Sequence, residues 1–531
     1  MVRFVPCLDP PPLPADEGDL TLSAALIDHT GYISAAAVSN ATTAVGTMSP
    51  GTPIHVSFCL ARPPRLSYLC VHFPGAAAGR DVGTPGGPDP GTPAVRCAED
   101  HPRVLATHAD LALIRVHIPG EGNVSDFRSF DYFVYTARPR PGESSLRRLP
   151  SPHAAPFQNN EVAVLRCPAA AGDRFVVAGL RLTIDPRQFL LQRYDSAAGR
   201  WTSTRVVAPC DPERDRVLPI PAAAPRRRFH DTAKAVVLGP ATVGWVDLWR
   251  GILFCDVLST NPVLRDMPLP KPARANRRSF CKGAPYPSRD LAVVTLPTQQ
   301  QEIRYLEMET RPGELPQRQR LPADDDGSGS NSDSDSGPDI NVAMFWKATV
   351  WTMPVPVTRW ADWRKDCAVD VTDIAVDDPR LSELLLRLPV RLGSDPEEAE
   401  WSLRRLDTGH PALGLGVDSG SDVTVYFLAD SRDGKDWAIA VDVRGKKLLG
   451  MAQLDDRKNC GYLRCHYPTD ISKHLANATE VEQEHLSEEC PPLGNRKEAR
   501  IHALLPGVTK MKLAYVAERV HQAAVMLGRV P

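Results

Sequence analysis

The chain has 531 residues, and 62 Lys and Arg against 64 Asp and Glu give it a net charge of −2 at pH 7. Hydrophobic residues make up 42% of the sequence and charged residues 24%, the composition of a globular chain that can bury a core. A chain so close to neutrality lacks the basic surface that attracts nucleic acids or an anionic membrane, which excludes both as the main partner. Because 51 Pro and 36 Gly interrupt regular structure, we expect short elements joined by many turns.

The sequence offers no targeting or membrane-spanning segment. The first twenty residues hold no apolar stretch of the length that a secretory signal needs, and no run of about 18 apolar residues occurs anywhere. The 12 Cys are scattered along the chain, a pattern that favours reduced thiols over a disulfide framework. We therefore expect a protein of the cytoplasm or nucleus, without a membrane span.

The first part of the chain has the pattern of short strands separated by Gly and Pro. In residues 53–61, the apolar side chains of Ile54, Val56 and Phe58 alternate with polar or small ones. This two-residue period is typical of a half-buried strand. Residues 74–94 are rich in Gly and Pro and cannot pack a core, so we expect a loop there.

Further strands are expected through the first half of the chain. A basic, proline-rich connector is expected over residues 138–152. Single strands are predicted at residues 104–118 and 127–137. Residues 162–167 and 174–182 are predicted to form one hairpin-like pair, and residues 189–207 another.

The clearest unit spans residues 243–270. Two apolar strands flank a tight turn at Trp249, Arg250 and Gly251, where glycine can adopt a positive φ, and the second strand ends at Asp256. Trp245 lies within the first strand, where we expect it to be buried. We consider two interpretations of Trp249 and Arg250: side chains presented to a partner at a hairpin tip, as in many interfaces, or packing inside the domain.

The same order of elements recurs along the chain. A strand, a turn and a second strand that ends in an apolar residue followed by Asp are found three times. The three pairs are Tyr194-Asp195, Cys255-Asp256 and Val441-Asp442. Because a four-stranded sheet cannot bury both of its faces alone, repeated units of this kind stack radially. We predict a mainly β, irregular propeller-like array of six or seven blades over residues 21–495, and a pair of β-sandwiches is the alternative.

An acidic insert interrupts this pattern at residues 321–346. It contains six Asp among Ser and Gly and no basic residue before Lys347, so we expect it to be disordered. Ser330, Ser332 and Ser336 each have Asp three residues further on, the pattern that acidophilic kinases recognise. We predict phosphorylation at these three sites, with an unmodified solubilising insert as the alternative.

Helices are expected in few places. The Leu-rich residues 381–389 predict one short packed helix, and residues 496–531 predict a helical C-terminal extension with apolar positions at helical spacing. Residues 1–20 are expected to be disordered.

No motif in the sequence indicates catalysis, a cofactor or a metal. The best metal-ligand cluster is Cys460, Cys465, His466 and His474, and its spacing matches no common zinc module. Residues 413–420 resemble a dinucleotide fingerprint, but the third glycine falls one residue late. We therefore expect neither catalytic residues nor a cofactor or metal.

Residues 243–258 (VGWVDLWRGILFCDVL) resemble the family known as domain of unknown function 1618. Further resemblance lies in LIDHTGYIS, in VSFCLARPPRLSYLCVHFPG, in DYFVY and in VYFLADSRDGKDWAIAVDVRGKKLLG. It covers most of the chain, with a core over residues 243–454, and it is weakest in the acidic insert and the C-terminal extension. The resemblance implies a plant origin, and because the family has no established activity it carries over no site residue. The core is also similar, more loosely, to the propellers that follow F-boxes, although the N-terminal segment lacks an F-box.

Two functions from different classes follow. The repeated hairpins and the lack of a catalytic motif favour a non-enzymatic protein-interaction scaffold with a protein partner. The alternative is a small-molecule-binding or hydrolytic enzyme with its site in the propeller channel.

Overall fold

A computed structural model of the chain describes most of residues 24–475. Most of residues 1–23 and a few short gaps lie outside the description. So do the longer stretches 75–100, 119–128, 313–343, 389–402, 416–422, 456–465 and 476–531. The chain divides into a compact unit, Met1–Val481, and a second unit, Glu482–Pro531, which lies wholly outside the described residues.

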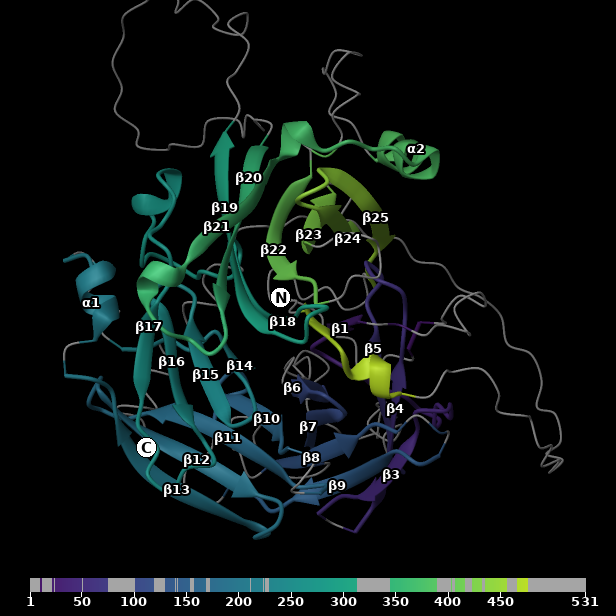
Figure 1. Cartoon of the computed structure of the whole chain (residues 1–531). Coiled ribbons are helices and arrows are strands. Elements are labelled where there is room, and N and C mark those ends of the chain that lie inside the picture. The colour runs from purple at the N-terminus through teal and green to yellow at the C-terminus, as the bar shows by residue number, and fades with distance from the viewer. Residues whose placement is uncertain are drawn as a thin grey trace, which may run out of the picture. The chain divides into compact units, whose positions relative to one another are not determined.

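Six four-stranded sheets in the compact unit are arranged around a common centre as the blades of a propeller (Figure 1). This arrangement confirms the mainly β propeller expected from the sequence and gives six blades. We number the blades in chain order. In blades 2 to 6 the chain runs from the innermost strand outward, and the first strands of blades 2 to 5 each contact the first strand of the next blade.

The strand bounds follow the blades. Blade 1 contains β2 (Tyr32–Ile33), β3 (Ala44–Thr47), β4 (Pro53–Cys59) and β5 (Tyr68–His72). Blade 2 contains β6 (Arg103–His108), β7 (Leu111–His117), β8 (Phe130–Thr136) and β9 (Ser145–Leu149). Blade 3 contains β10 (Val162–Arg166), β11 (Phe175–Leu182), β12 (Gln188–Asp195) and β13 (Arg200–Val207).

The remaining blades have the same composition. Blade 4 contains β14 (Lys234–Val237), β15 (Thr242–Asp247), β16 (Gly251–Asp256) and β17 (Arg265–Pro268). Blade 5 contains β18 (Arg289–Thr295), β19 (Gln301–Pro312), β20 (Met344–Pro354) and β21 (Arg364–Asp370). Blade 6 contains β22 (Asp407–Leu413), β23 (Thr424–Ser431), β24 (Lys435–Asp442) and β25 (Lys447–Gln453).

Antiparallel strand order gives blades 2 to 6 two distinct ends. The turns between the second and third strands lie at one end, and the turns between the first and second and between the third and fourth strands lie at the other. We call these the 2–3 end and the 3–4 end. The fourth strand also finishes at the 2–3 end, so the connection into the next blade begins there.

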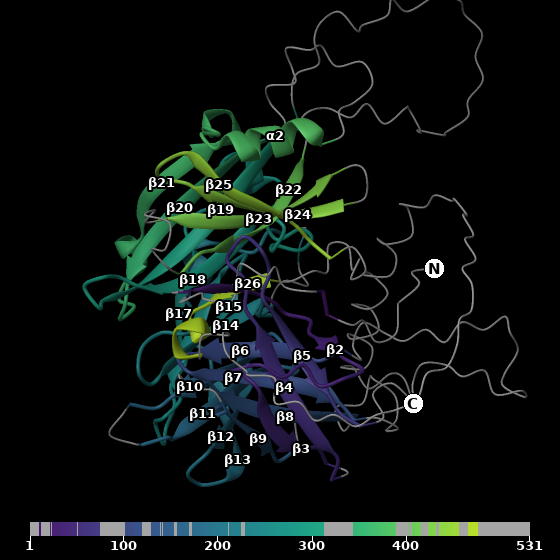
Figure 2. The same ribbon diagram turned by 90° about the vertical axis from the view of Figure 1, so that its right-hand side faces the viewer.

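Two strands from distant parts of the sequence close the ring. β1 (Ala25–Asp28) pairs antiparallel with β26 (His466–Thr469), and β26 also contacts β22 of blade 6. β1 and β2 run parallel to β5 of blade 1. Figure 2 shows the strands of blade 1 beside those of blade 2. Residues after blade 6 therefore complete blade 1 and hold the ring shut without a covalent bond.

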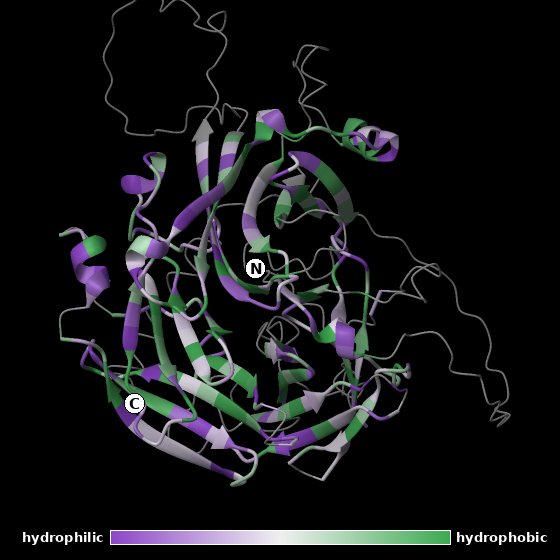
Figure 3. Cartoon of the chain, in the orientation of Figure 1, coloured by the Kyte–Doolittle hydropathy of each residue, from purple (hydrophilic) through white to green (hydrophobic). Residues whose placement is uncertain are grey.

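Apolar side chains between adjacent blades form the core. The rings of Trp346 in blade 5 and Phe427 in blade 6 have centroids 4.9 Å apart, and those of Phe58 in blade 1 and Tyr135 in blade 2 are also 4.9 Å apart. The outermost strands β9 and β13 are mostly exposed and largely hydrophilic (Figure 3). Burial of apolar surface between the blades is the main source of stability for such a ring.

The repeated Asp predicted from the sequence ends the third strand of its blade in all three cases. Asp195, Asp256 and Asp442 each accept a hydrogen bond from a backbone N–H two or three residues further on, at 3.0, 2.8 and 2.8 Å. A short carboxylate side chain stabilises a turn in this way. The recurrence in the sequence is therefore the signal of the turn into the fourth strand.

Two predicted elements of blade 2 need correction. Residues 104–118 form two strands, β6 and β7, because Ala109 adopts a φ of 51° and the chain reverses there. The expected connector at residues 138–152 contains the strand β9. Most residues of β9 are exposed, so its sequence lacks the apolar alternation that reveals a half-buried strand.

The acidic insert ends earlier than predicted. Met344 to Trp346, which the prediction included in residues 321–346, belong to β20, and the indole of Trp346 is buried in the core. The rest of the insert lies outside the described residues, as do residues 496–531 and most of residues 1–20.

Two α-helices lie in the described part of the chain. The expected helix at residues 381–389 is confirmed as α2 (Pro379–Arg387), with Leu385 buried and the Asp378 carboxylate accepting a hydrogen bond from a backbone N–H at its start. The other helix is α1 (Glu213–Val217), in the connection between blades 3 and 4. Neither has the length and apolar character of a membrane span.

Candidate functional site

The turn containing Trp249 and Arg250 joins β15 to β16 at the 2–3 end. Gly251 has a φ of 154°, and a Cβ at this position would lie 2.3 Å from the carbonyl oxygen of Met267, so glycine is required. Both side chains point into the domain, since Trp249 is only 4% exposed and Arg250 only 1%. The interpretation of Trp249 and Arg250 as side chains exposed at a hairpin tip is therefore wrong. The alternative interpretation, packing inside the domain, fits both residues. Trp245 is fully buried, as expected.

Segments distant in the sequence cover Trp249. The guanidinium of Arg289 lies 4.3 Å from its ring centroid, and the Phe280 ring meets it edge-on at 5.9 Å. The indole N–H donates to the carbonyl of Gly283 at 3.3 Å. Arg289 also forms a buried ion pair with Glu307 at 2.7 Å. These contacts fix the turn of blade 4 against blade 5.

A second buried charged cluster surrounds Arg250. Its guanidinium pairs with Asp215 in α1, while an amino group of Arg214 lies 2.8 Å from Nδ1 of His230. Burial, together with the two arginines, holds the pKa of His230 well below its usual value, so this imidazole is neutral. Burial also raises the pKa of Asp247 in the same turn.

Asp290 joins the innermost strands of three blades. One carboxylate oxygen lies 2.6 Å from the ammonium of Lys234 in blade 4. The other accepts a hydrogen bond from the backbone N–H of Leu413 in blade 6 at 2.9 Å. Asp290 itself belongs to blade 5 and is buried. Its ion pair with Lys234 and its hydrogen bond from Leu413 therefore connect blades 4, 5 and 6 near the centre of the ring.

Glu161 is the described carboxyl most suited to proton transfer. It stands directly before β10 at the 2–3 end, and burial raises its pKa to about 7, although the N–H of Gln158 donates to it at 2.9 Å. The negative charge of nearby Asp231 raises the pKa further. A carboxyl that titrates near neutral pH can take up or release a proton, or bind a cationic group. The sequence alone gave no signal for Glu161.

Large apolar side chains are exposed at the 2–3 end of blade 3. Ile184 in the turn between β11 and β12 is 88% exposed, Val207 at the end of β13 is 53% exposed, and Phe229 before β14 is 38% exposed. We call these three residues the blade 3 apolar surface. Arg187 and Arg205 nearby are also exposed. An apolar residue between Thr and Asp-Pro in a turn was the available sequence signal for Ile184.

Phe189 connects these three positions. The register of blade 3 places Phe189 beside the end of β13, and its ring lies 6.3 Å from that of His230. Val207 ends β13, Phe229 is the chain neighbour of His230, and Ile184 lies in the turn that leads into β12. The three exposed side chains therefore belong to the same end of blade 3.

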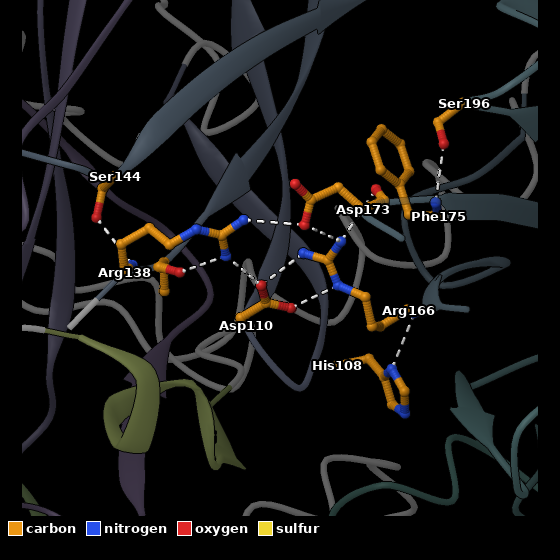
Figure 4. A network of polar contacts seen from close by, with 9 residues as sticks. His108, Asp110, Arg138, Ser144, Arg166, Asp173, Phe175 and Ser196 are labelled. Atoms are coloured by element: carbon orange, nitrogen blue, oxygen red, sulfur yellow. Dashed lines mark hydrogen bonds and ion pairs between the residues drawn. The ribbon is translucent and has the colours of Figure 1, made fainter. Parts of the chain in front are cut away.

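Charged side chains at the opposite, 3–4 end pair with one another (Figure 4). Asp110 accepts hydrogen bonds from Arg138 at 2.6 Å and from Arg166 at 2.5 and 2.7 Å, and both arginines also approach Asp173. Burial acts to raise the pKa of Asp110, but the hydrogen bonds and charges of the two arginines outweigh it and lower the pKa. This network joins blade 2 to blade 3.

Other residues singled out in the sequence lie elsewhere. Ser330, Ser332 and Ser336 are outside the described residues, as are Cys460 and Cys465. Among the residues that the structure describes, no group of three or more His, Cys, Asp or Glu could hold a metal ion.

The fold defines the class of the described domain, and part of the sequence matches a family model. The described domain is a six-bladed β-propeller. Residues 245–419 match the model of a family described as a protein of unknown function (DUF1618), and this match supports the resemblance inferred from the core of the sequence. The match begins in β15 and ends after β22. A search of curated protein sequences finds no match.

Solved structures match this chain at low similarity. A lectin of Aleuria aurantia in complex with alpha-methyl-L-fucoside has 9% identity and a TM-score of 0.27, over 84% of this chain and 100% of that chain. The alpha-L-arabinofuranosidase Arb93A of Fusarium graminearum, with an iminosugar inhibitor, has 9% identity and a TM-score of 0.25, over 78% of this chain and 81% of that chain. TM-scores of this size carry no argument about function.

Proposed function

We propose that this propeller is a non-enzymatic protein-interaction scaffold that binds a protein partner through the blade 3 apolar surface. The proposal rests on the exposure of Ile184, Val207 and Phe229 at one end of one blade. Burying such side chains against a partner removes apolar surface from water, which is the main favourable contribution to association. A partner, rather than the fold, explains why three large apolar side chains gather there.

The charges beside this surface indicate the chemistry of the partner. The exposed Arg187 and Arg205 can donate to carboxylates at the rim of an interface, where complementary charge increases the rate of association. We therefore expect a partner segment that presents apolar side chains flanked by Asp or Glu. The chain's own insert at residues 321–346 is also acidic, so it is a candidate to compete with the partner for Arg187 and Arg205.

The buried charges of the 2–3 end support a binding rather than a catalytic role. Arg289 is engaged by Glu307 and Lys234 by Asp290, and the buried Arg250 contacts Asp215. Each pair connects different elements of the ring. Charged groups used in this way stabilise the surface on which a partner docks.

A tagged pull-down from tissue that expresses the protein tests the proposal. Ile184→Glu combined with Val207→Glu places charge on the apolar surface, and Val263→Glu is the matched control because Val263 is 70% exposed in the 3–4 turn of blade 4. The proposal predicts a partner retained by the wild type and by the control and lost from the double variant. Equal retention by all three proteins contradicts it.

Glu161 favours a second candidate function, a small-molecule-binding or hydrolytic site in the propeller channel. A carboxyl with a pKa of about 7 beside Asp231 has the properties of a general acid or base. Thermal-shift screening of small basic and hydrolysable compounds tests this function. It predicts a compound that stabilises the wild type but not the Glu161→Gln variant, and a screen without such a compound removes the candidate.

A further inference from the structure

Two buried cysteines lie side by side in blade 1. Cys59 ends β4, and Cys70 lies in the antiparallel neighbour β5, two positions from the residue opposite Cys59. The two sulfur atoms are 3.8 Å apart, and the two cysteines are not joined by a disulfide. Cys59 is 5% exposed and Cys70 is 2% exposed. Among the cysteines that the structure describes, this is the pair whose sulfur atoms are in contact.

The surroundings of Cys59 favour its thiolate. The Cys70 thiol hydrogen-bonds to the Cys59 sulfur and lowers the pKa of Cys59; burial opposes this effect, and a hydrogen bond from Tyr68 supports it. The thiolate is the nucleophilic form of cysteine, so Cys59 is the more reactive member of the pair. Cys70 is positioned to attack any oxidised form of its neighbour.

We propose that Cys59 and Cys70 form a peroxide-sensitive dithiol that closes to a disulfide between β4 and β5. The Cys59 thiolate attacks one oxygen of hydrogen peroxide, the O–O bond breaks, and the departing hydroxide takes a proton to become water. The sulfur of Cys70 then attacks the resulting sulfenic acid, the S–O bond breaks, and the Cys70 proton leaves with the hydroxide as a second water. Two thiols are oxidised and one peroxide is reduced.

Closure requires the two strands to shift slightly. A disulfide bond is about 2.05 Å long, so the sulfurs must approach by about 1.8 Å from their contact distance. Because the register places Cys59 and Cys70 diagonally across the strand pair, where Cα atoms are commonly about 7–8 Å apart, closure needs a backbone shift in β4 or β5 as well as side-chain rotation. Both cysteines are in regular strands, and Cys59 is slightly more exposed than Cys70, at 5% against 2%.

The pair lies close to the place where the ring closes. Tyr32 and Tyr68 pack with the two cysteines in a small apolar cluster. The hydroxyl of Tyr32 donates to Asp455, which follows the last strand of blade 6, at 2.8 Å. A disulfide at this position crosslinks β4 to β5 directly beside the contact between blades 1 and 6. Oxidation therefore changes the part of the ring that has no covalent closure.

Other buried cysteines of the same domain provide internal controls. Burial raises the pKa of Cys255 in blade 4 to about 12, and burial also raises the pKa of Cys167 in blade 3. Neither is paired with another cysteine among the described residues. Both should remain thiols under conditions that oxidise the pair.

Disulfide mapping of the native, full-length protein tests the proposal. The protein is treated with hydrogen peroxide, free thiols are alkylated, and the digested peptides are identified by mass spectrometry. We expect a linked peptide pair joining Cys59 to Cys70, lost on reduction with dithiothreitol, and thiol loss at these positions at least about 10-fold faster than at Cys255. Because the linked residues are identified directly, oxidation of cysteines elsewhere in the chain does not confuse the result.

Two variants complete the test. Cys59→Ser and Cys70→Ser each remove the linked peptide, whereas Cys255→Ser leaves it unchanged. Circular dichroism establishes that the wild type remains folded during treatment, so the wild-type map decides the question even if a variant folds poorly. The proposal is overturned if a folded wild type keeps both thiols, oxidises them separately without a link, or loses Cys255 at the same rate.

Discussion

The two ends of the propeller use charged and apolar side chains in opposite ways. At the 2–3 end, Arg289 and Arg250 are buried in ion pairs while Ile184 is exposed. At the 3–4 end, Asp110 and its arginines are paired near the surface, and carboxylates cap the turns. The 3–4 end therefore satisfies its own polar groups. The 2–3 end of blade 3 exposes three large apolar side chains, whereas the 3–4 turn of blade 4 exposes one, Val263, and grouped apolar exposure is the usual property of a docking face.

The largest expected difference between the two ends concerns the buried pair of Arg289 and Glu307. Arg289→Ala leaves the Glu307 carboxylate buried without its partner and should lower the free energy of unfolding by about 3–5 kcal/mol. Arg138→Ala at the 3–4 end removes a partly exposed partner and should cost about 1 kcal/mol or less. Urea unfolding measures both. Equal losses would show that burial does not distinguish the two ends.

The second largest expected effect is the change in the free energy of unfolding with pH that Glu161 causes. Its pKa is about 7 when folded against 4.5 otherwise, so the folded protein binds the proton more tightly. The free energy of unfolding should therefore fall as the pH rises from about 4.5 to about 7, by on the order of 2 kcal/mol from this group. Glu161→Gln should remove that part of the pH dependence. Parallel pH profiles for the wild type and the variant would contradict the expectation.

A smaller effect is expected at the 3–4 end itself. Asp110→Ala removes hydrogen bonds from two arginines between blades 2 and 3 and should lower the free energy of unfolding by about 1–2 kcal/mol. Because the pKa of Asp110 is lowered in the folded protein, its contribution is present above about pH 4 and is lost as the pH falls further. Asp173→Ala is the matched control, since the Asp173 side chain is 87% exposed and should contribute less than about 0.5 kcal/mol. Chemical unfolding of the Asp110→Ala and Asp173→Ala variants at pH 7 and at pH 3 measures both contributions.

The smallest change in stability is expected at the blade 3 apolar surface. Ile184→Glu and Val207→Glu alter exposed positions and should change the free energy of unfolding by less than about 0.5 kcal/mol each. Their effect should appear in partner binding instead. Thermal unfolding of the double variant checks that any loss of binding does not reflect loss of the fold.

The sequence predicts those features of the fold that depend on local patterns. The repeated Asp195, Asp256 and Asp442 indicate the turns into the fourth strands, and Leu-rich spacing indicates α2. The strand β9 escapes prediction because an outermost strand needs no apolar face.

The candidate site depends on contacts that no local pattern reveals. Trp249 is buried because Phe280 and Arg289 cover it, and these residues are more than thirty positions away in the chain. The raised pKa of Glu161 likewise comes from burial and from the charge of Asp231, which is seventy positions away in the chain. The turn residues Thr183, Asp185 and Pro186 place Ile184 in a turn, but its exposure depends on the fact that no other part of the described chain covers it. Contacts between residues distant in the sequence, rather than residue type, therefore determine whether Trp249, Glu161 and Ile184 are buried or exposed.

The most direct test of the blade 3 apolar surface is the comparison of three tagged proteins in a quantitative pull-down: the wild type, the Ile184→Glu and Val207→Glu double variant, and the Val263→Glu control. Deleting residues 321–343 in a fourth protein, which leaves β20 intact, tests the acidic insert as a competitor. A docking role at blade 3 predicts a partner that the wild type and control retain equally, that the double variant loses by at least about 10-fold, and that the deletion retains more strongly. A partner retained equally by the double variant and the wild type would contradict it.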